Sequence, residues 1–105
     1  MKCFPDSNAD VEVVIKNNRA SKNKICSGYR PAFKINDSYL TTGIIKLTDC
    51  FELGFGEESK AEVWFITPEF YPHSLEIGQV IQFQEGKEIH GMVTIIKINN
   101  DMLKK

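Results

Sequence analysis

Cysteine and histidine are the residue types in this chain that could carry nucleophilic or metal chemistry. The cysteines are Cys3, Cys26 and Cys50, and the histidines are His73 and His90. The cysteines form no CxxC pair and the histidines have no neighbouring second ligand, so a zinc site is not expected. No spacing indicates a catalytic triad either. The sequence therefore predicts a chain with no enzymatic activity, metal or cofactor.

A run of positive charge could instead bind phosphate groups or an acidic partner. Residues 16–34 contain six cations and no acidic residue: Lys16, Arg19, Lys22, Lys24, Arg30 and Lys34. Such a run can neutralise several phosphates, and binding would then weaken steeply as salt rises. The alternative is a solvated loop. The planar guanidinium of Arg30 suits phosphate or carboxylate, but it could equally lie beside Tyr29 and hold a loop carbonyl.

Negative charge is concentrated further along the chain. Residues 49–62 contain Asp49, Glu52, Glu57, Glu58 and Glu62 against a single lysine, Lys60. The net charge of the whole chain is only −1. The separation of the two runs therefore predicts a dipolar molecule rather than one that attracts polyanions as a whole.

An aromatic segment offers a second candidate surface. Phe70, Tyr71 and His73 lie in an irregular stretch that also contains Pro68 and Pro72. Exposed rings on a stiffened loop suit a protein interface, because they bury much area at a small cost in entropy. The alternative, which the sequence leaves open, is that these rings cap one end of a β-barrel.

Short β-strands are the elements that would position these residues. Alternating or β-branched apolar residues occur in six stretches bounded by turn-forming residues: 11–15, 33–36, 44–47, 61–67, 79–84 and 88–98. Residues 17–23 and 54–58 are predicted loops, residues 36–38 a turn, and residues 85–87 the tight turn of a hairpin. Trp64 lies within an apolar stretch and is predicted to be buried in the core. Regularly spaced strands without an amphipathic helix indicate an all-β barrel or sandwich.

Length and composition predict one domain. The chain has 105 residues, of which 42% are hydrophobic and 10% aromatic, which is enough for a folded core. We expect a flexible leader over residues 1–9, the barrel over 10–98 and a frayed polar tail over 99–105. No apolar stretch has the length of a signal peptide or a membrane span. We therefore expect a cytoplasmic protein with reduced thiols and no membrane partner.

Two motifs, in the same order and at compatible spacing, resemble the C-terminal (third) domain of elongation factor Tu. The first is its Gly-Tyr-Arg-Pro-x-Phe signature and the second its closing hairpin, and the matching positions are Gly28, Tyr29, Arg30, Pro31, Phe33, Glu85, Gly86 and Gly91. The resemblance covers residues 10–98. It implies an all-β fold, a six-stranded antiparallel β-barrel like that translation-factor domain, here standing alone in a bacterial cytoplasm.

The resemblance also sets expectations about partners. In the family this barrel faces the GTPase domain, aminoacyl-tRNA and the nucleotide-exchange partner. This chain has no GxxxxGK[ST] loop, so no GTP binding is expected, and Gln84 replaces the arginine of the closing hairpin. We therefore expect a non-enzymatic module that binds a protein, as a mimic, a regulator or an immunity-type protein. The alternatives are tRNA binding through residues 16–34 and Arg30, or a scaffold domain for another subunit.

Overall fold

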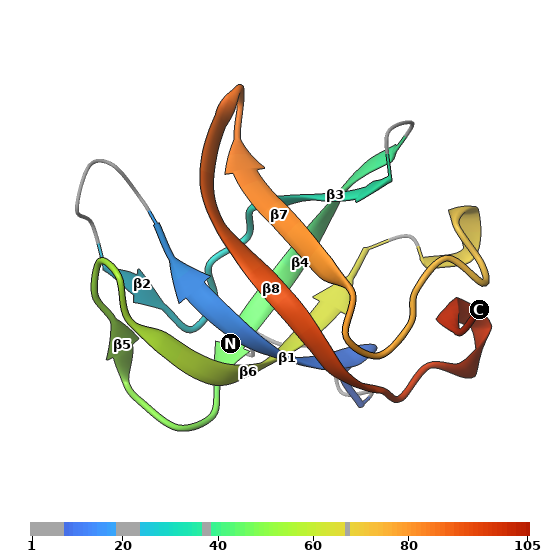
Figure 1. Cartoon of the computed structure of the whole chain (residues 1–105), viewed down its shortest axis with the longest axis horizontal. Helices are drawn as coiled ribbons and strands as arrows, with labels where there is room; N and C mark the ends of the chain where they lie inside the picture. Colours follow the sequence, from blue (N-terminus) through green and yellow to red (C-terminus); the bar gives the residue numbers. More distant parts are fainter. Residues whose placement is uncertain (1–7, 19–23, 37–38, 67) are drawn as a thin grey trace.

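Six β-strands form a closed antiparallel barrel in the computed structural model, which describes residues 8–18, 24–36, 39–66 and 68–105 (Figure 1). The order around the barrel is β1, β6, β4, β3, β7 and β8, and β8 pairs again with β1. The bounds are β1 (Val11–Asn17), β3 (Ala32–Asn36), β4 (Tyr39–Leu47), β6 (Glu58–Phe65), β7 (Val80–Glu85) and β8 (Glu88–Ile98). The all-β barrel expected from the sequence is thus confirmed.

Four smaller elements complete the described part of the chain. The two-residue strands β2 (Ile25–Cys26) and β5 (Glu52–Leu53) pair with each other outside the barrel. Two single turns of 3-10 helix are η1 (Pro68–Phe70) and η2 (Asp101–Leu103). Within the described ranges, no helix has the length and apolar character needed to cross a membrane.

The predicted strands all correspond to barrel strands because their apolar residues alternate. In β1 the side chains of Val11, Val13 and Ile15 are buried while those between them are half-buried, which is the period of a strand with one core face. The β8 bounds agree with the predicted 88–98, and the hairpin turn is confirmed by the pairing of β7 with β8. The predicted turn residues 37–38 and residue 67 lie outside the described residues.

Two phenylalanines meet in the centre of the barrel. Phe33 on β3 and Phe83 on β7 are both fully buried, and their ring centroids are 6.0 Å apart. Both rings lie against glycine: a Cβ at Gly43 would approach the Phe33 ring to 2.6 Å, and one at Gly91 would collide with Phe83 and with the backbone carbonyl of Lys16. The two glycines therefore make room for the two rings.

Trp64 is buried, as predicted, with 8% of its surface exposed. It does not belong to the central core cluster, which contains its neighbours Val63 and Phe65. Side chains alternate along a strand, so Trp64 lies on the opposite face of β6 from these two residues. Its burial therefore arises on the outer face of the barrel.

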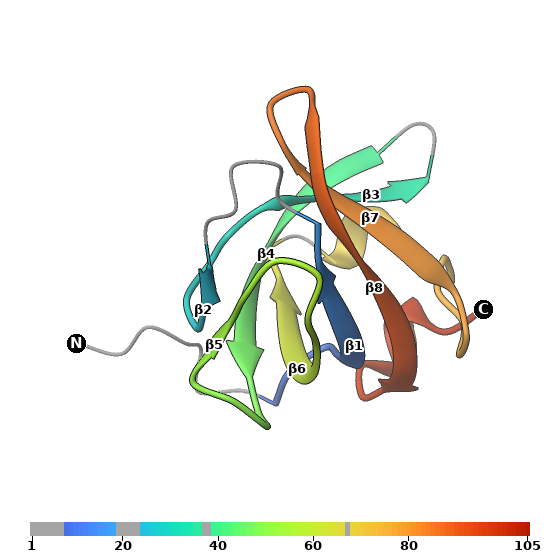
Figure 2. The same ribbon diagram turned by 60° about the vertical axis from the view of Figure 1, so that its left-hand side comes forward.

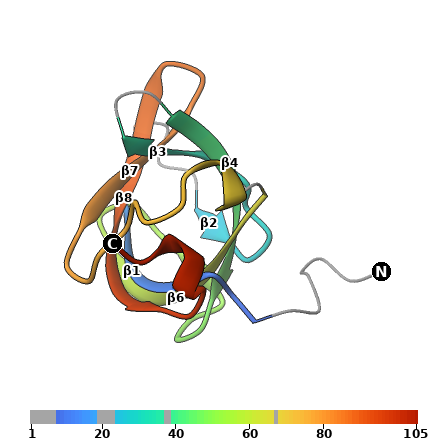
Figure 3. The ribbon, with the colours of Figure 1, turned by 90° about the vertical axis from the view of Figure 1, so that its right-hand side faces the viewer.

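The expected fraying of the carboxyl-terminal tail is wrong. Leu103 is fully buried, and its carbonyl accepts a hydrogen bond of 2.9 Å from the Leu75 amide. The Lys105 amide in turn donates to the Leu75 carbonyl at 2.9 Å. Leu103 belongs to the same buried cluster as Leu75 and Tyr71, and the tail lies against the barrel end seen in Figure 3. Most of the predicted leader, residues 1–7, lies outside the described residues.

Candidate functional site

The signature run, residues 28–33, is hydrogen-bonded to β4 and leads directly into β3. The Gly28 amide donates to the Ile45 carbonyl at 2.8 Å, and the Ile45 amide donates to the Tyr29 carbonyl at 3.0 Å. Gly28 has a φ of 98°, a left-handed conformation that glycine adopts without a steric cost. The Pro31 carbonyl accepts from Gly43 at 3.2 Å. The run therefore positions strand β3 rather than forming a pocket.

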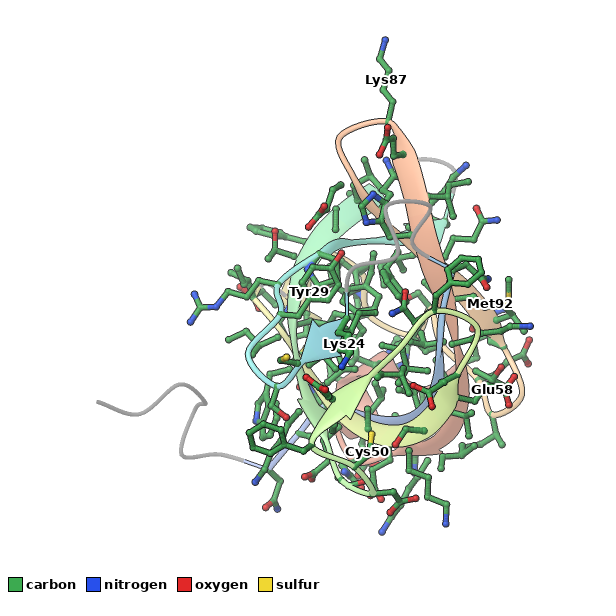
Figure 4. All side chains as sticks on the ribbon, turned by 90° about the vertical axis from the view of Figure 1, so that its left-hand side faces the viewer. Lys24, Tyr29, Cys50, Glu58, Lys87 and Met92 are labelled. Carbon is green, nitrogen blue, oxygen red and sulfur yellow. The ribbon has the colours of Figure 1, made fainter. Side chains whose placement is uncertain are left out.

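Within this run, only Arg30 is classed as exposed. The Tyr29 ring is half-buried and packs edge-on against Phe83, with centroids 6.0 Å apart and an angle of 78° between the planes. Pro31 and Phe33 are buried. Figure 4 shows Tyr29 above Lys24 on this side of the barrel. The guanidinium of Arg30 is thus the one group of the signature that a partner could reach from solvent.

The second motif forms the hairpin between β7 and β8. Gly86 occupies the turn with a φ of 58°, and Lys87 stands at its tip in Figure 4. His90 is buried, with Nδ1 at 3.4 Å from a Glu85 oxygen and Nε2 at 3.3 Å from a Glu88 oxygen. Glu85 and Glu88 therefore both lie beside the buried His90 ring within the hairpin. Glycine at 91 is required by the close approach of the strands described above.

The basic residues of the 16–34 run are not gathered on one surface. Lys24 precedes β2 and is exposed, whereas Lys34 is exposed on β3, and Figures 1 and 2 show β2 and the end of β3 on opposite sides of the molecule. Lys16 is half-buried on β1. Arg19 and Lys22 lie outside the described residues. The described members therefore offer separate contacts rather than one phosphate-binding stripe.

The two charged runs meet, so the expected separation of charge does not hold for the described residues. Lys24 Nζ lies 2.6 Å from Glu52 Oε1, and this hydrogen bond together with the carboxylate charge raises the pKa of Lys24. Lys16 stands opposite Glu58 in the register of β1 with β6. Antiparallel pairing of β2 with β5 and of β1 with β6 brings these distant segments side by side.

The aromatic segment divides its rings between the core and the surface. Tyr71 is 4% exposed, its hydroxyl donates to Thr41 Oγ1 at 3.0 Å, and its ring packs edge-on against Phe65. Phe70, one residue earlier, is 66% exposed. Tyr71 therefore caps the barrel end and is not an exposed interface residue, whereas Phe70 remains available to a partner.

His73 has a structural contact as well as exposure. Its amide donates to the Met102 carbonyl at 2.8 Å, and its Nδ1 lies 2.7 Å from the Lys104 carbonyl oxygen. Its φ of 57° is the one positive value at a described non-glycine residue. His73 therefore ties the aromatic segment to the carboxyl-terminal tail.

Four exposed apolar residues lie on the segments that meet near the Thr41–Tyr71 hydrogen bond. We call this set the apolar patch, and its members are Tyr39, Leu40, Ile66 and Phe70, exposed by 47%, 57%, 60% and 66%. Tyr39 and Leu40 precede Thr41, and Phe70 precedes Tyr71. The Ile66 amide donates to the Thr42 carbonyl at 3.1 Å, so all four lie at one end of the barrel.

Sequence reasoning identified Phe70 in this patch but missed the other three residues. A signal was present at Tyr39 and Leu40, because consecutive apolar residues in a strand cannot both face the core. The same signal marks Ile66, which follows the buried Phe65 within the predicted stretch 61–67. Its exposure depends on where the chain leaves the barrel.

A small hollow beside β2 contains both described cysteines. Cys26, Ser27, Leu47, Cys50 and Phe51 line a volume of about 340 Å³. Both thiols are free, and Phe51 is 90% exposed. Over the ranges that the structure describes, no cluster of three or more histidine, cysteine or acidic side chains is arranged to hold a metal ion.

Comparisons with known proteins add no relative. No protein-family model matches the chain, and no curated protein matches its sequence.

Proposed function

We propose that this chain is a non-enzymatic binding module whose main ligand is another protein, and that the apolar patch is its contact surface. The single observation that carries the proposal is that the exposed residues Tyr39, Leu40, Ile66 and Phe70 lie on segments that meet at one barrel end. Scattered exposed apolar residues are normal, but a contiguous group is typical of an interaction site.

The contacts that hold the apolar patch in place favour a role in protein binding. Tyr71 fixes the segment that holds Phe70, and its ring centroid lies 6.4 Å from that of Tyr39. A pre-ordered surface loses little conformational entropy when a partner binds. Aromatic side chains at the centre of such a surface commonly supply much of the binding free energy.

We also propose that the barrel is of the elongation factor Tu C-terminal type. The resemblance of the signature residues supports this proposal, and so do the positive φ of Gly28 and the buried position of Phe33. A domain of that type suits a mimic, a regulator or an immunity-type protein. GTP and membranes have no role in this proposal.

A matched pair of isoleucines tests the apolar patch. Ile66 lies in the patch and is 60% exposed, and Ile77 lies outside it and is 61% exposed. The purified chain is used to capture its partner from the native cytoplasm, and the affinity of each variant for that partner is measured by calorimetry. We expect Ile66→Ser to weaken binding about tenfold, because truncating an interface anchor costs on the order of 1–2 kcal/mol. Equal affinity of Ile66→Ser and Ile77→Ser would remove the patch from the proposal.

RNA binding is the second candidate, and the exposure of Arg30 favours it. The basic residues that the structure describes are dispersed, and Lys24 is paired with Glu52. RNA binding therefore has less support than protein binding. A titration with tRNA at rising salt tests it. Binding at low salt that falls steeply with salt indicates several phosphate contacts, and no binding at low salt excludes this use.

A further inference from the structure

Residues 68–75, which contain the aromatic segment, lie outside the barrel sheet, between β6 and β7. Their main chain is hydrogen-bonded to the carboxyl-terminal tail. The Leu75 amide donates to the Leu103 carbonyl at 2.9 Å, and Leu75 forms an isolated parallel bridge with Lys104. The His73 amide also donates to a carbonyl of the tail, at 2.8 Å. The tail therefore holds this part of the chain at the barrel end.

Leu103 is the side chain that the tail contributes to the core. It is fully buried, in the same cluster as Tyr71 and Leu75. The turn η2, which contains Leu103, lies beside the turn η1, which contains Phe70. Loss of the Leu103 side chain would therefore remove packing from the cluster that holds Tyr71, the residue next to Phe70 of the apolar patch.

The tail is attached to the barrel just before η2 begins. The Asn99 and Asn100 amides both donate to the Asp10 carbonyl, at 2.9 Å and 3.1 Å. The Asn100 side chain also donates to the Asp10 carboxylate at 2.9 Å. The last barrel strand, β8, ends at Ile98, and η2 begins at Asp101. Release of the chain after Asn100 would therefore leave the barrel ladders intact.

The outer part of the tail has weaker contacts than Leu103. Lys104 and Lys105 are exposed, and together with Leu75 and other residues they line a hollow of about 240 Å³. Lys105 Nζ lies 3.4 Å from Glu76 Oε1, but both side chains are more than half exposed, and such pairs often contribute nothing measurable. Segments with few buried contacts open locally while the rest of a protein stays folded. The attachment of the tail beyond Asn100 therefore depends chiefly on Leu103.

We propose that residues 101–105 form a latch that controls the apolar patch, with Leu103 as its positioning residue. While Leu103 is buried, the tail holds residues 71–75, and Phe70 is presented at the barrel end. When the tail is released, residues 71–75 lose these hydrogen bonds and the patch loses its ordered Phe70, while the six-stranded barrel stays folded. The effect on a partner rests on the proposed function, whereas the opening of the latch is a property of the free chain.

Amide hydrogen exchange of the natural chain in low concentrations of urea tests whether the latch opens separately from the barrel. We expect the His73 and Leu75 amides to exchange through an opening that urea promotes little, because a local opening exposes little surface. The Ile45 amide donates to the Tyr29 carbonyl in the barrel, and its protection factor should be at least about tenfold higher. Equal protection and equal urea dependence of the three amides would overturn the latch.

Two variants identify the side chain on which the latch depends. Leu103→Ala should speed exchange at His73 and Leu75 at least about tenfold, and Leu103→Met, which nearly conserves the volume, should restore the natural rates. Phe33→Leu is the control in the barrel core: it should speed exchange at Ile45 but not at His73 or Leu75, because Phe33 stays buried while the latch is open. Unchanged exchange at His73 and Leu75 in Leu103→Ala, or equal acceleration of all three amides in Phe33→Leu, contradicts the inference. If Leu103→Ala fails to fold, the measurement on the natural chain decides.

The control of the patch is measured with the partner captured from the native cytoplasm. Leu103→Ala should weaken its binding about twofold to tenfold, because apparent affinity falls with the fraction of chains that keep the latch closed, and Leu103→Met should bind like the natural chain. Binding that depends on Ile66 but not on Leu103 overturns the control of the patch and leaves the proposed function standing. Binding that ignores both residues removes the patch itself, and the exchange rates still decide whether the tail opens.

Discussion

The signature run and the aromatic segment both combine prolines with aromatic rings, but they use them differently. In the signature run, Phe33 is fully buried on a regular strand. In the aromatic segment, neighbouring Phe70 and Tyr71 lie outside and inside the barrel. Within a strand, the alternation of side chains determines whether an aromatic ring faces the core. In a loop, the position of the ring depends on its contacts with distant parts of the chain. For Tyr71 that contact is Thr41, 30 residues away in the chain.

The largest expected effect comes from truncating one phenylalanine in each region. We expect Phe33→Ala to lower the free energy of unfolding by about 3–5 kcal/mol, because it leaves a cavity in the core. Phe70→Ala, at a position 66% exposed, should change the free energy of unfolding by at most about 0.5 kcal/mol. Urea denaturation of both variants measures this contrast. A similar loss of unfolding free energy in the two variants would mean that Phe70 also stabilises the fold. The two regions would then not differ in this respect.

A side chain added at Gly91, in the second motif, should produce the next largest loss of unfolding free energy. Gly91→Ala places a Cβ against the Phe83 ring and the Lys16 carbonyl, and we expect a loss of about 1–3 kcal/mol in the free energy of unfolding. Gly54→Ala is the control, because its Cβ would meet only the carboxylate end of Glu57. Urea midpoints of the two variants test the assignment. If Gly91→Ala is as stable as Gly54→Ala, the tight strand contact at residue 91 is refuted.

Removal of the Tyr71 hydroxyl tests how the aromatic segment is held at the barrel end. Tyr71→Phe deletes the donor to Thr41 Oγ1 and should cost about 1 kcal/mol of unfolding free energy. Tyr39→Phe alters a ring that is 47% exposed and should have little effect. Thermal unfolding of both variants at one pH measures the difference. No loss for Tyr71→Phe would show that ring packing alone positions Tyr71.

The smallest expected effect concerns the ion pair of Lys24 with Glu52. Both side chains are largely exposed, at 60% and 41%, and such pairs often contribute nothing measurable. Because the folded-state pKa of Lys24 is raised above its ordinary 10.5, any stabilisation is present below that pH and is lost as pH rises through the folded pKa. We expect Lys24→Met to leave the urea midpoint unchanged at pH 7. A clear decrease at pH 7 that disappears as the pH rises through the raised pKa of Lys24 would instead show that the pair matters.

Much of the barrel could be predicted because its strands repeat apolar residues with the period of two. The short strands β2 and β5 were missed, because two residues cannot display a period. The buried Leu103 was missed for a similar reason: a single leucine in a polar tail has no pattern, and its burial depends on Leu75. Among the candidate surfaces, the sequence offered Phe70 and Arg30 as possible contact residues, each with a structural alternative, but it did not indicate the apolar patch.

Residue types and their spacing were enough to predict the strands, the hairpin of residues 85–87 and the burial of Phe33, because these depend on neighbours close in sequence. Tertiary structure alone decided that Lys24 meets Glu52, that Tyr71 turns inward and that β3 leaves β7 after Phe33. Each of these depends on which distant segments become adjacent when the barrel closes, and local patterns carry no information about such pairings.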